Sequence, residues 1–310
     1  DEQVSVLGFG AASLSGSGGG YGFGAIEDEA AIELVHAAQG AGINLFDTAP
    51  IYGFGESERR LGLALSDRRD DVFVVSKSGV AYDANHNVRI DNSPVTTQHM
   101  LESSLKRLQT DMIDLYLVHW PDPKVDIRKT METLTRAKER GLIRYIGLSN
   151  TNTLDLSRAR EITSVDVVQF EASFLNPCAL DALQETEDLQ AMGVMSWGTL
   201  AKGILTGRVT RDRKFDSLDV RNTAPWWVNA DHEPSFEIMD QLTPMLVERG
   251  HTGLELAMGY LLHREVVDTL LCGVRTHEQL DSAIESIANL PDDDLLHRAL
   301  AVRDGVWSKT

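Results

Sequence analysis

The stretch NLFDTAPIYGFGESERRLG, residues 44–62, reads as a strand, a turn and a helix in succession. An apolar run from Ile43 stops on Asp47, a turn rich in glycine carries Tyr52, and a pattern of helical period begins at Glu56. The run is short and almost continuously apolar, which is typical of a strand buried on both faces. The stretch therefore predicts one strand–helix unit of a parallel sheet, with a carboxylate at the end of the strand and a tyrosine just beyond it.

The same unit recurs along the chain. The predicted strands are residues 6–10, 43–47, 72–77, 114–119, 144–149, 165–171, 193–197 and 268–273. The predicted helices are residues 27–39, 56–66, 94–108, 127–139, 153–161, 178–191, 253–263 and 276–288. Strict alternation indicates a parallel sheet, and eight repeats fit a closed (β/α)8 TIM barrel better than an open doubly wound sheet. No linker rich in proline, serine or glycine divides the chain, so we expect a single domain over residues 1–310.

Two segments do not follow this alternation. Residues 15–24, SGSGGGYGFG, form a loop dense in glycine after the first strand. Residues 203–235 form a long irregular excursion after the seventh strand. Loops of that length in a compact domain are usually functional or disordered, so both segments are candidates for the walls of a binding site.

Composition limits the partners of the protein. The formal charge of −18 and the isoelectric point near 4.8 disfavour binding to nucleic acid or to anionic membranes. The two cysteines, Cys178 and Cys272, are too few for a disulfide framework and suit a reducing compartment. The first residues are acidic where a secretory signal is basic, and no apolar run approaches the roughly 20 residues of a membrane span. We therefore expect a cytoplasmic protein.

Metal and mononucleotide motifs are missing from the sequence. The nine histidines include no close pair, and the chain has no HExxH, CxxC or GxxxxGK[ST] motif, so we expect no metal site. Gly8-Phe9-Gly10 resembles part of a dinucleotide fingerprint, but the next predicted helix begins about 17 residues later. A Rossmann site needs that helix directly after the glycines, so this interpretation is disfavoured.

Polar residues end several of the predicted strands. They are Asp47, Lys77, His119, Ser149 with Asn150, Gln169, and Trp197. Each has an ordinary structural explanation, such as a turn cap for Asp47 or a satisfied core histidine for His119. In a barrel, however, the C-terminal strand ends meet at the rim that carries the chemistry. Asp47 and Lys77 lie on neighbouring strands and are expected to pair, because a buried charge is costly without a partner.

Four motifs occur in order along the chain: FDTAPIYGFGESERRLG (46–62), VVSKSG (74–79), LYLVHWPDP (115–123) and IRYIGLSN (143–150). By these motifs the chain resembles the aldo-keto reductase family, from about Leu7 to Ile287. By this resemblance the catalytic residues are Asp47, Tyr52, Lys77 and His119. The VHWPDP motif is similar to that of bacterial stress-type reductases and of sugar or myo-inositol-related oxidoreductases.

The chemistry of these side chains suits carbonyl reduction. A free tyrosine has a pKa of about 10, and a nearby ammonium favours the phenolate. We therefore expect Lys77, held charged by Asp47, to lower the pKa of Tyr52. Tyr52 would act as general acid in reduction and general base in oxidation, while His119 orients the carbonyl.

The resemblance also implies a nicotinamide dinucleotide, with NADP(H) preferred and NAD(H) as the alternative. Ser149, Asn150 and Gln169 match residues that bind the carboxamide, and Trp197 matches the aromatic that stacks on the nicotinamide. The segment from Trp197 through Gly198 to Leu200 departs from the usual aromatic-Ser-Pro-Leu but keeps its backbone donors. The remaining cofactor residues implied are Lys202, Arg208, Gly273, Arg275 and Gln279.

The expected cofactor contacts draw on a basic patch and a helix start. Lys202, Arg208, Arg211, Arg213 and Lys214 fall within thirteen residues of an otherwise acidic protein. Arg208 matches the family's pyrophosphate-contacting cation, and Arg275 stands where it could grip a 2′-phosphate. Thr276 opens a helix there, which would direct backbone amides at a phosphate. Ser282 and Ala283 depart from the family's usual Glu and Asn near the adenine.

Aromatic residues in the loops are the candidates for the substrate pocket. Tyr21, Phe54, Trp120 and Trp226 are expected to line it, which suits a small carbonyl or alcohol substrate with an apolar or planar body. Two other functions stay open. One is an NAD-linked dehydrogenase of aldose or pyridoxal type, and the other is a cofactor-sensing subunit like the potassium-channel β-subunits. Turnover without a stable membrane partner would favour the enzyme. The sequence leaves open whether the protein is a monomer or a homo-oligomer.

Overall fold

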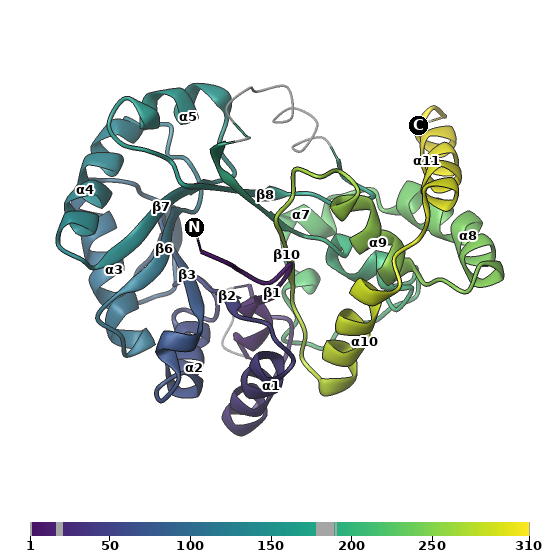
Figure 1. Ribbon diagram of the computed structural model, residues 1–310, viewed down its shortest axis with the longest axis horizontal. Helices are drawn as coiled ribbons and strands as arrows, with labels where there is room; N and C mark the ends of the chain where they lie inside the picture. Colours follow the sequence, from purple (N-terminus) through teal and green to yellow (C-terminus); the bar gives the residue numbers. More distant parts are fainter. Residues whose placement is uncertain (1, 17–20, 178–188, 190, 310) are drawn as a thin grey trace.

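The computed structural model describes residues 2–16, 21–177, 189 and 191–309, and within these residues eight parallel strands close into a barrel (Figure 1). The strands run in the ring order β1-β10-β9-β8-β7-β6-β3-β2. Their bounds are β1 Leu7–Gly10, β2 Leu45–Asp47, β3 Phe73–Ser78, β6 Ile113–Val118, β7 Ile143–Ser149, β8 Val167–Glu171, β9 Gly193–Trp197 and β10 Thr269–Cys272. Each lies within one or two residues of a predicted strand. The predicted (β/α)8 barrel is therefore confirmed.

Helices surround the strands (Figure 1). Those that match predicted helices are α1 Asp28–Gly40, α2 Glu56–Ala64, α3 Pro94–Leu108, α4 Ile127–Glu139, α5 Thr153–Arg160, α9 Gly253–Leu262 and α10 His277–Ala288. The start signals act as expected, since the side chain of Ser93 accepts a hydrogen bond from the Thr96 amide and that of Thr276 from the Gln279 amide. Of the predicted helix 178–191, only residues 189 and 191 lie within the described part of the chain.

Two long helices, a hairpin and several short turns were not predicted. Helix α8 (Glu233–Glu248) begins inside the excursion, and α11 (Asp293–Trp307) follows the last strand–helix unit. The two helices pack against each other, away from the centre of the barrel (Figure 1). Strands β4 (Val80–Tyr82) and β5 (Val88–Ile90) form a hairpin between β3 and α3. The rest of the excursion holds only short helical turns, η4 Ala201–Thr206, η5 Val220–Asn222 and α7 Pro225–Val228; the other short turns are η1 Ala11–Leu14 and η2 Arg69–Asp71.

The strands separate two apolar layers. The inside of the barrel is filled by Leu45, Val75, Leu115, Leu117, Met195 and Leu271. A larger layer lies between strands and helices, with Phe9, Phe46 and Tyr116 among its largest fully buried side chains. Successive side chains of a strand point to opposite faces. Once one side chain is known to point inward, every second side chain along that strand must also point inward.

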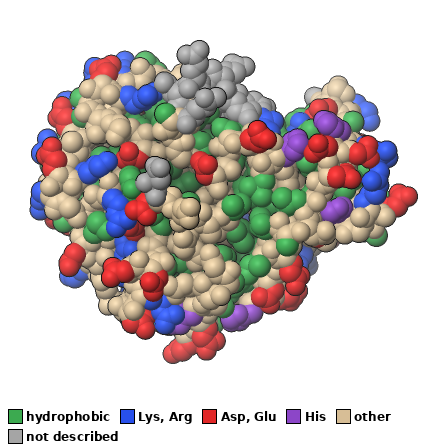
Figure 2. Space-filling model, in the orientation of Figure 1, with side chains coloured by type: hydrophobic (Ala, Val, Ile, Leu, Met, Phe, Trp, Pro, Cys, Tyr) green, Lys and Arg blue, Asp and Glu red, His purple; other side chains and the backbone are tan. Residues whose placement is uncertain are grey.

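Charged side chains of both signs lie on the face drawn in Figure 2. On the face drawn in Figure 2, acidic side chains are scattered among lysines and arginines and do not gather into one block. The described part of the chain contains no helix that is both long enough and apolar enough to cross a membrane.

Candidate active site

The alternation of side chains brings the polar residues of five strands to one place. Leu45, Val75 and Leu117 face the inside of the barrel. The residues that continue the inward rows toward the C-terminal strand ends are Asp47, Lys77, His119, Gln169 and Trp197. A period of two therefore directs all of them to the interior at the rim where the sequence places the chemistry.

A buried ion pair lies at the centre of this group. The Lys77 Nζ donates to Asp47 Oδ1 at 2.6 Å and to the carbonyl of Thr48 at 2.9 Å, and the Gln169 Nε2 donates to Asp47 Oδ2 at 2.8 Å. Lys77 is fully buried and Asp47 is 3% exposed. Burial lowers the pKa of Lys77, and the carboxylates of Asp47 and Glu58 oppose that shift by favouring the ammonium. The expected pairing of Asp47 with Lys77 is present.

Tyr52 and His119 complete the group. Tyr52 lies in the turn between β2 and α2, where its amide donates to the Ala49 carbonyl at 3.1 Å. The Lys77 Nζ is 5.2 Å from the centroid of the Tyr52 ring. The His119 ring lies edge-on to the Tyr52 ring, with centroids 5.9 Å apart and planes at 90°. The four side chains thus converge from three strand ends and one turn.

The direction of one pKa shift differs from expectation. Burial raises the pKa of Tyr52 well above 10, and the negative charge of Asp47 adds to the rise. Burial of the phenol is the largest cause of this rise, so the net pKa shift is opposite to the lowering that the sequence predicts. Burial and the Lys77 ammonium lower the pKa of His119 well below 6.5, so its imidazole is neutral at neutral pH.

Ser149, Asn150 and Trp197 form a second network beside the first. The Asn150 Nδ2 donates to the His119 carbonyl and to Ser149 Oγ, both at 3.0 Å, and Ser149 Oγ donates to Gln169 Oε1 at 3.2 Å. The indole Nε1 of Trp197 donates to Asn150 Oδ1 at 3.1 Å. Asn150 adopts a left-handed backbone with φ of 52°, which its short polar side chain tolerates. The indole ring is thereby held at the barrel mouth.

The segment after β9 continues this surface. Gly198 has φ of 74°, and a Cβ there would lie 3.1 Å from Cγ of Glu171. After Leu200, the ammonium of Lys202 lies over the rings of both Trp197 and Trp226, at 5.6 and 5.7 Å, and pairs with Glu171. Burial lowers the pKa of Lys202 to about 8. Arg208 is exposed and pairs with Glu278 in the first turn of α10 at 2.7 Å.

Arg275 has a different set of contacts from those expected. Its guanidinium donates to the carbonyl oxygens of Phe23 and Ala25, the second at 2.7 Å, and its backbone amide donates to Gln279 Oε1 at 2.8 Å. Among the residues that the structure describes, the Nε atom is buried without a hydrogen-bond partner. Arg275 therefore ties the first loop to the start of α10, next to Gly273 at the end of β10.

The predicted substrate residues lie in three environments. Tyr21 is 40% exposed and lies in the first loop. Trp120 and Trp226 are 43% and 36% exposed. Phe54 instead stacks on His86, with centroids 3.9 Å apart, and packs edge-on against Tyr82 of the hairpin. Phe54 thus joins the hairpin to the turn that carries Tyr52.

Sequence reasoning missed a buried pair under this turn. Glu58 of α2 is fully buried; its Oε1 accepts from Ser76 Oγ and its Oε2 from Arg107 Nε, both at 2.6 Å. Arg107 also packs so closely on Gly55 that a Cβ there would lie 2.6 Å from the arginine Cδ. The spacing of Glu58 with the buried Leu61 on one helix face is the signal that indicates its burial.

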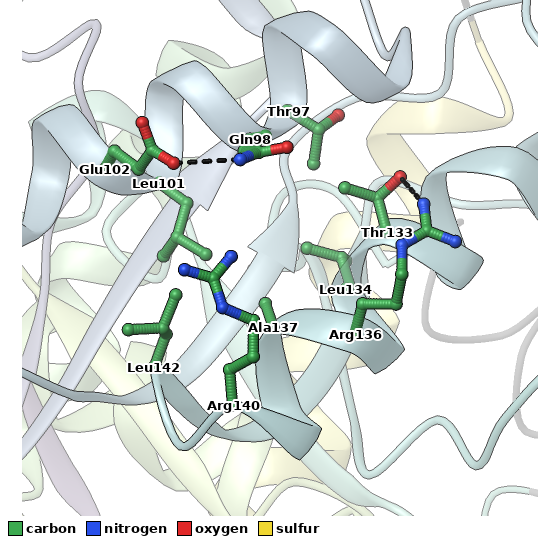
Figure 3. A pocket seen from close by; sticks show the side chains of 10 residues that line it. All are labelled: Thr97, Gln98, Leu101, Glu102, Thr133, Leu134, Arg136, Ala137, Arg140 and Leu142. Carbon is green, nitrogen blue, oxygen red and sulfur yellow. Dashed lines mark hydrogen bonds between the residues drawn. The ribbon is translucent and has the colours of Figure 1, made fainter.

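Two hollows elsewhere in the described part of the chain hold none of the predicted site residues. A groove of about 210 Å³ runs between α3 and α4, with Leu101, Leu142 and Arg140 among its lining (Figure 3). A hollow of about 550 Å³ lies at the N-terminal strand ends beside Asn44 and Phe73, opposite the rim with Lys77. Within the described ranges, no group of three or more His, Cys, Asp or Glu side chains is arranged to hold a metal ion.

Comparison with known proteins identifies the family. The model of the aldo/keto reductase family matches residues 6–297. Aldo-keto reductase YhdN of Bacillus subtilis is 32% identical over 286 residues, which are 91% of this chain and 85% of that protein. The NADH-specific methylglyoxal reductase of Escherichia coli is 27% identical over 309 residues, with 95% and 93% coverage.

Solved structures agree with the sequence matches. The glycerol dehydrogenase AKR11B4 from Gluconobacter oxydans superposes with a TM-score of 0.83 at 27% identity, covering 100% of this chain and 93% of that one. The aldo-keto reductase AKR11C1 from Bacillus halodurans has a TM-score of 0.78 at 24% identity, and the match covers 98% of this chain and 93% of that one. It supports the fold. The closed barrel, the family match over nearly the whole chain and the named reductases agree: this chain belongs to the aldo/keto reductase family and is an NAD(P)H-dependent oxidoreductase.

Proposed function

We propose that this protein, as a single domain, reduces an aldehyde or ketone to the alcohol, with NADP(H) as its preferred cofactor and Tyr52 as the proton donor. The observation that carries the proposal is the convergence of Asp47, Tyr52, Lys77 and His119 on one rim of the barrel. A buried ammonium next to a phenol and a neutral imidazole is an arrangement that can deliver a proton to an oxygen while another group attacks the adjacent carbon.

The rim suits a nicotinamide dinucleotide. The half-buried indole of Trp197 is a flat surface fixed by Asn150, and the hydroxyl of Ser149 and the amide of Gln169 lie beside it. When bound, the cofactor supplies the hydride for the carbonyl carbon. We assign Ser149, Asn150 and Gln169 to its carboxamide, and Trp197 to the face of its ring. The segment toward the phosphates and the adenosine comprises Gly198, Leu200, Lys202, Arg208, Gly273, Arg275 and Gln279.

Each of the four tetrad residues has its own part in the transfer of a proton to the substrate oxygen. The O–H bond of Tyr52 breaks and its proton goes to the substrate oxygen as the carbonyl carbon gains the hydride. The Lys77 ammonium stabilises the phenolate that remains, and Asp47 keeps that ammonium charged in a site from which water is excluded. The neutral His119 donates one N–H to the substrate oxygen and so orients the carbonyl. Tyr21, Trp120 and Trp226 form apolar walls around the substrate, with Phe54 behind the turn.

Tyr52 can act in both directions of the reaction. Its raised pKa means that the phenol keeps its proton at neutral pH, so the proton donor is present before substrate arrives. The oxidative direction needs the phenolate as a base, and the Lys77 ammonium beside the ring favours that form. The oxidation of an aldose therefore stays the alternative to carbonyl reduction.

Tyr52→Phe tests the assignment of the proton donor. We expect turnover of an aldehyde panel with NADPH to fall by about 10² to 10⁴-fold, since that is the usual contribution of a general acid. Binding of NADPH, followed by quenching of tryptophan fluorescence, should be unchanged. Tyr145→Phe is the matched control, because Tyr145 lies on β7 away from the rim and should leave turnover as it is. Turnover by Tyr52→Phe within a few-fold of wild type would show that another group donates the proton.

The choice of cofactor needs its own test. NADP(H) is favoured by Arg275 at the N-terminus of α10, and Arg275→Met should then raise the KM for NADPH far more than the KM for NADH. One observation favours NAD(H) instead: the guanidinium of Arg275 donates to the carbonyls of Phe23 and Ala25. If that contact is its main role, the substitution raises both KM values equally, and NAD(H) becomes the preferred assignment.

A further inference from the structure

Three segments that carry proposed site residues meet at the barrel mouth. The first loop, residues 21–25, contains Tyr21; the turn at residues 201–203 contains Lys202; and the excursion segment at residues 215–228 contains Trp226. They are far apart in the sequence and none is a strand of the barrel. Something outside the barrel sheet must hold them in a fixed relation, because loops without such contacts move independently.

Arg221 contacts all three segments. Its Nη1 donates to the carbonyl of Lys202 at 2.7 Å. Its guanidinium lies 4.0 Å from the ring centroid of Phe215 and 5.4 Å from that of Phe23. The backbone adds a direct link between two of the segments, because the Val220 amide donates to the Gly22 carbonyl at 2.8 Å.

Asp219 fixes the direction of this side chain. Arg221 Nε donates to Asp219 Oδ1 at 2.9 Å and Nη2 donates to Oδ2 at 2.6 Å, a bidentate pair. The side chains are only 14% and 3% exposed. The contact with the Lys202 carbonyl matters for the site, because Lys202 has a left-handed backbone with φ of 55° and its ammonium lies over Trp197 and Trp226.

We propose that Arg221, oriented by Asp219, is a positioning residue that joins these three segments into one wall of the active site and thereby sets the affinity for the carbonyl substrate. The effect on affinity rests on the proposed function, whereas the joining of the segments does not. Arg221 touches none of the tetrad residues, so the wall it holds determines how well substrate binds and leaves the chemistry of the bound substrate unchanged.

The chain contains a matched control for this pair. Arg128 follows Asp126 at the same spacing, and Asp126 caps α4 as Asp219 caps η5. Arg128 makes the same bidentate contact, with Nη2 at 2.6 Å from Asp126 Oδ2. That pair is 40% and 36% exposed and adds only an exposed contact to Glu161. The two motifs therefore share local geometry and differ in what the arginine joins.

The experiment compares Arg221→Lys and Asp219→Asn with Arg128→Lys. Lysine keeps the charge but loses the fork that reaches Asp219 and the Lys202 carbonyl together. We expect Arg221→Lys and Asp219→Asn to raise the KM for the aldehyde by about tenfold with kcat within about threefold, and Arg128→Lys to leave both unchanged. Limited proteolysis with chymotrypsin, which does not cut at arginine or lysine, should become faster at Phe215 and Trp226 in the two mouth variants alone.

Each of three results overturns the proposal. The first is wild-type KM and cleavage in both mouth variants. The second is a fall in kcat with a raised KM that Arg128→Lys reproduces. The third is faster cleavage with an unchanged KM, because the pair would then hold the fold without setting affinity. Circular dichroism and thermal unfolding check that each variant is folded. If wild-type protein reduces no carbonyl compound, the proposed function fails, and the cleavage pattern still decides whether Arg221 joins the segments.

Discussion

Asp47→Asn removes the negative charge that accompanies the buried Lys77 ammonium and keeps the size of the side chain. In the wild-type protein the Lys77 Nζ contacts Asp47 Oδ1 at 2.6 Å and the Thr48 carbonyl at 2.9 Å, and Lys77 is fully buried. After the substitution the ammonium retains only neutral acceptors. Removing one partner of a buried ion pair typically destabilises a protein by about 3 to 5 kcal/mol.

The protonation equilibrium of Lys77 sets an upper limit to this cost. A lysine with an ordinary pKa of 10.5 can release its proton on folding at pH 7. That release spans about 3.5 pH units at about 1.36 kcal/mol each, or about 5 kcal/mol. The variant therefore loses between about 3 and 5 kcal/mol of unfolding free energy at neutral pH, a large fraction of the usual 5 to 15 kcal/mol.

The loss should depend on pH in a defined direction. In Asp47→Asn the pKa of Lys77 falls further below 10.5, because burial is then opposed by fewer charges. Between the folded pKa and 10.5, the unfolded chain holds a proton that the folded variant does not, so unfolding free energy rises with pH. The difference in unfolding free energy between variant and wild type should thus narrow as the pH rises toward 10.5.

Urea unfolding of both proteins at several pH values from neutral to alkaline measures this gap. Asp67→Asn is the control, since Asp67 pairs with Arg68 on the surface and its loss should change little at any pH. A difference below about 1 kcal/mol at neutral pH, which is the size expected of an exposed pair, would refute the reasoning. So would a larger difference that stays constant with pH.

Three further outcomes follow from buried groups. Because burial holds the pKa of His119 well below 6.5, the unfolded chain takes up a proton before the folded protein does as the pH falls, and this lowers the unfolding free energy. In His119→Gln the unfolding free energy should therefore fall less steeply below pH 6.5 than in wild type. Parallel pH curves for the two proteins would contradict this. Gly62→Ala places a Cβ 2.6 Å from the Arg107 carbonyl oxygen and should cost about 1 to 3 kcal/mol in urea unfolding, while Gly40→Ala, with nothing within 4 Å, should cost nothing. Burial raises the pKa of Cys272 to about 12, so in a Cys178→Ser background a thiol reagent should react only on unfolding, and rapid labelling of folded protein would count against it.

The repeating elements could be predicted because their signals are local. Short runs of β-branched and aliphatic residues predict the strands, and Ser93 and Thr276 mark helix starts from their own sequence. Helix α8 was missed because it carries Pro244 in its interior and begins within the excursion. Helix α11 was missed because it follows α10 in the sequence without a strand between them, so it belongs to no strand–helix unit. Both bury their apolar faces against each other.

Some features of the candidate site could likewise be predicted from local sequence, and others could not. Asp47, Lys77 and His119 end strands, and the period of two is enough to direct them inward. Other contacts join residues that lie 18 to 49 positions apart in the sequence: the hydrogen bonds of Glu58 with Ser76 and Arg107, and that of Arg221 with Lys202. Nothing in the neighbouring sequence indicates these partners. The direction of the Tyr52 pKa shift also required the fold, because it depends on how much water burial removes from the phenol.

The sequence by itself determined the barrel, the family and the rim on which the four catalytic candidates gather, since each depends on local period and on motifs that lie within one strand–helix unit. Only the tertiary structure decided the direction of the Tyr52 pKa shift, the contacts of Arg275 and the way Arg221 joins the loops of the mouth. Those properties arise from desolvation and from contacts between distant segments, and both are fixed when the chain closes into a barrel.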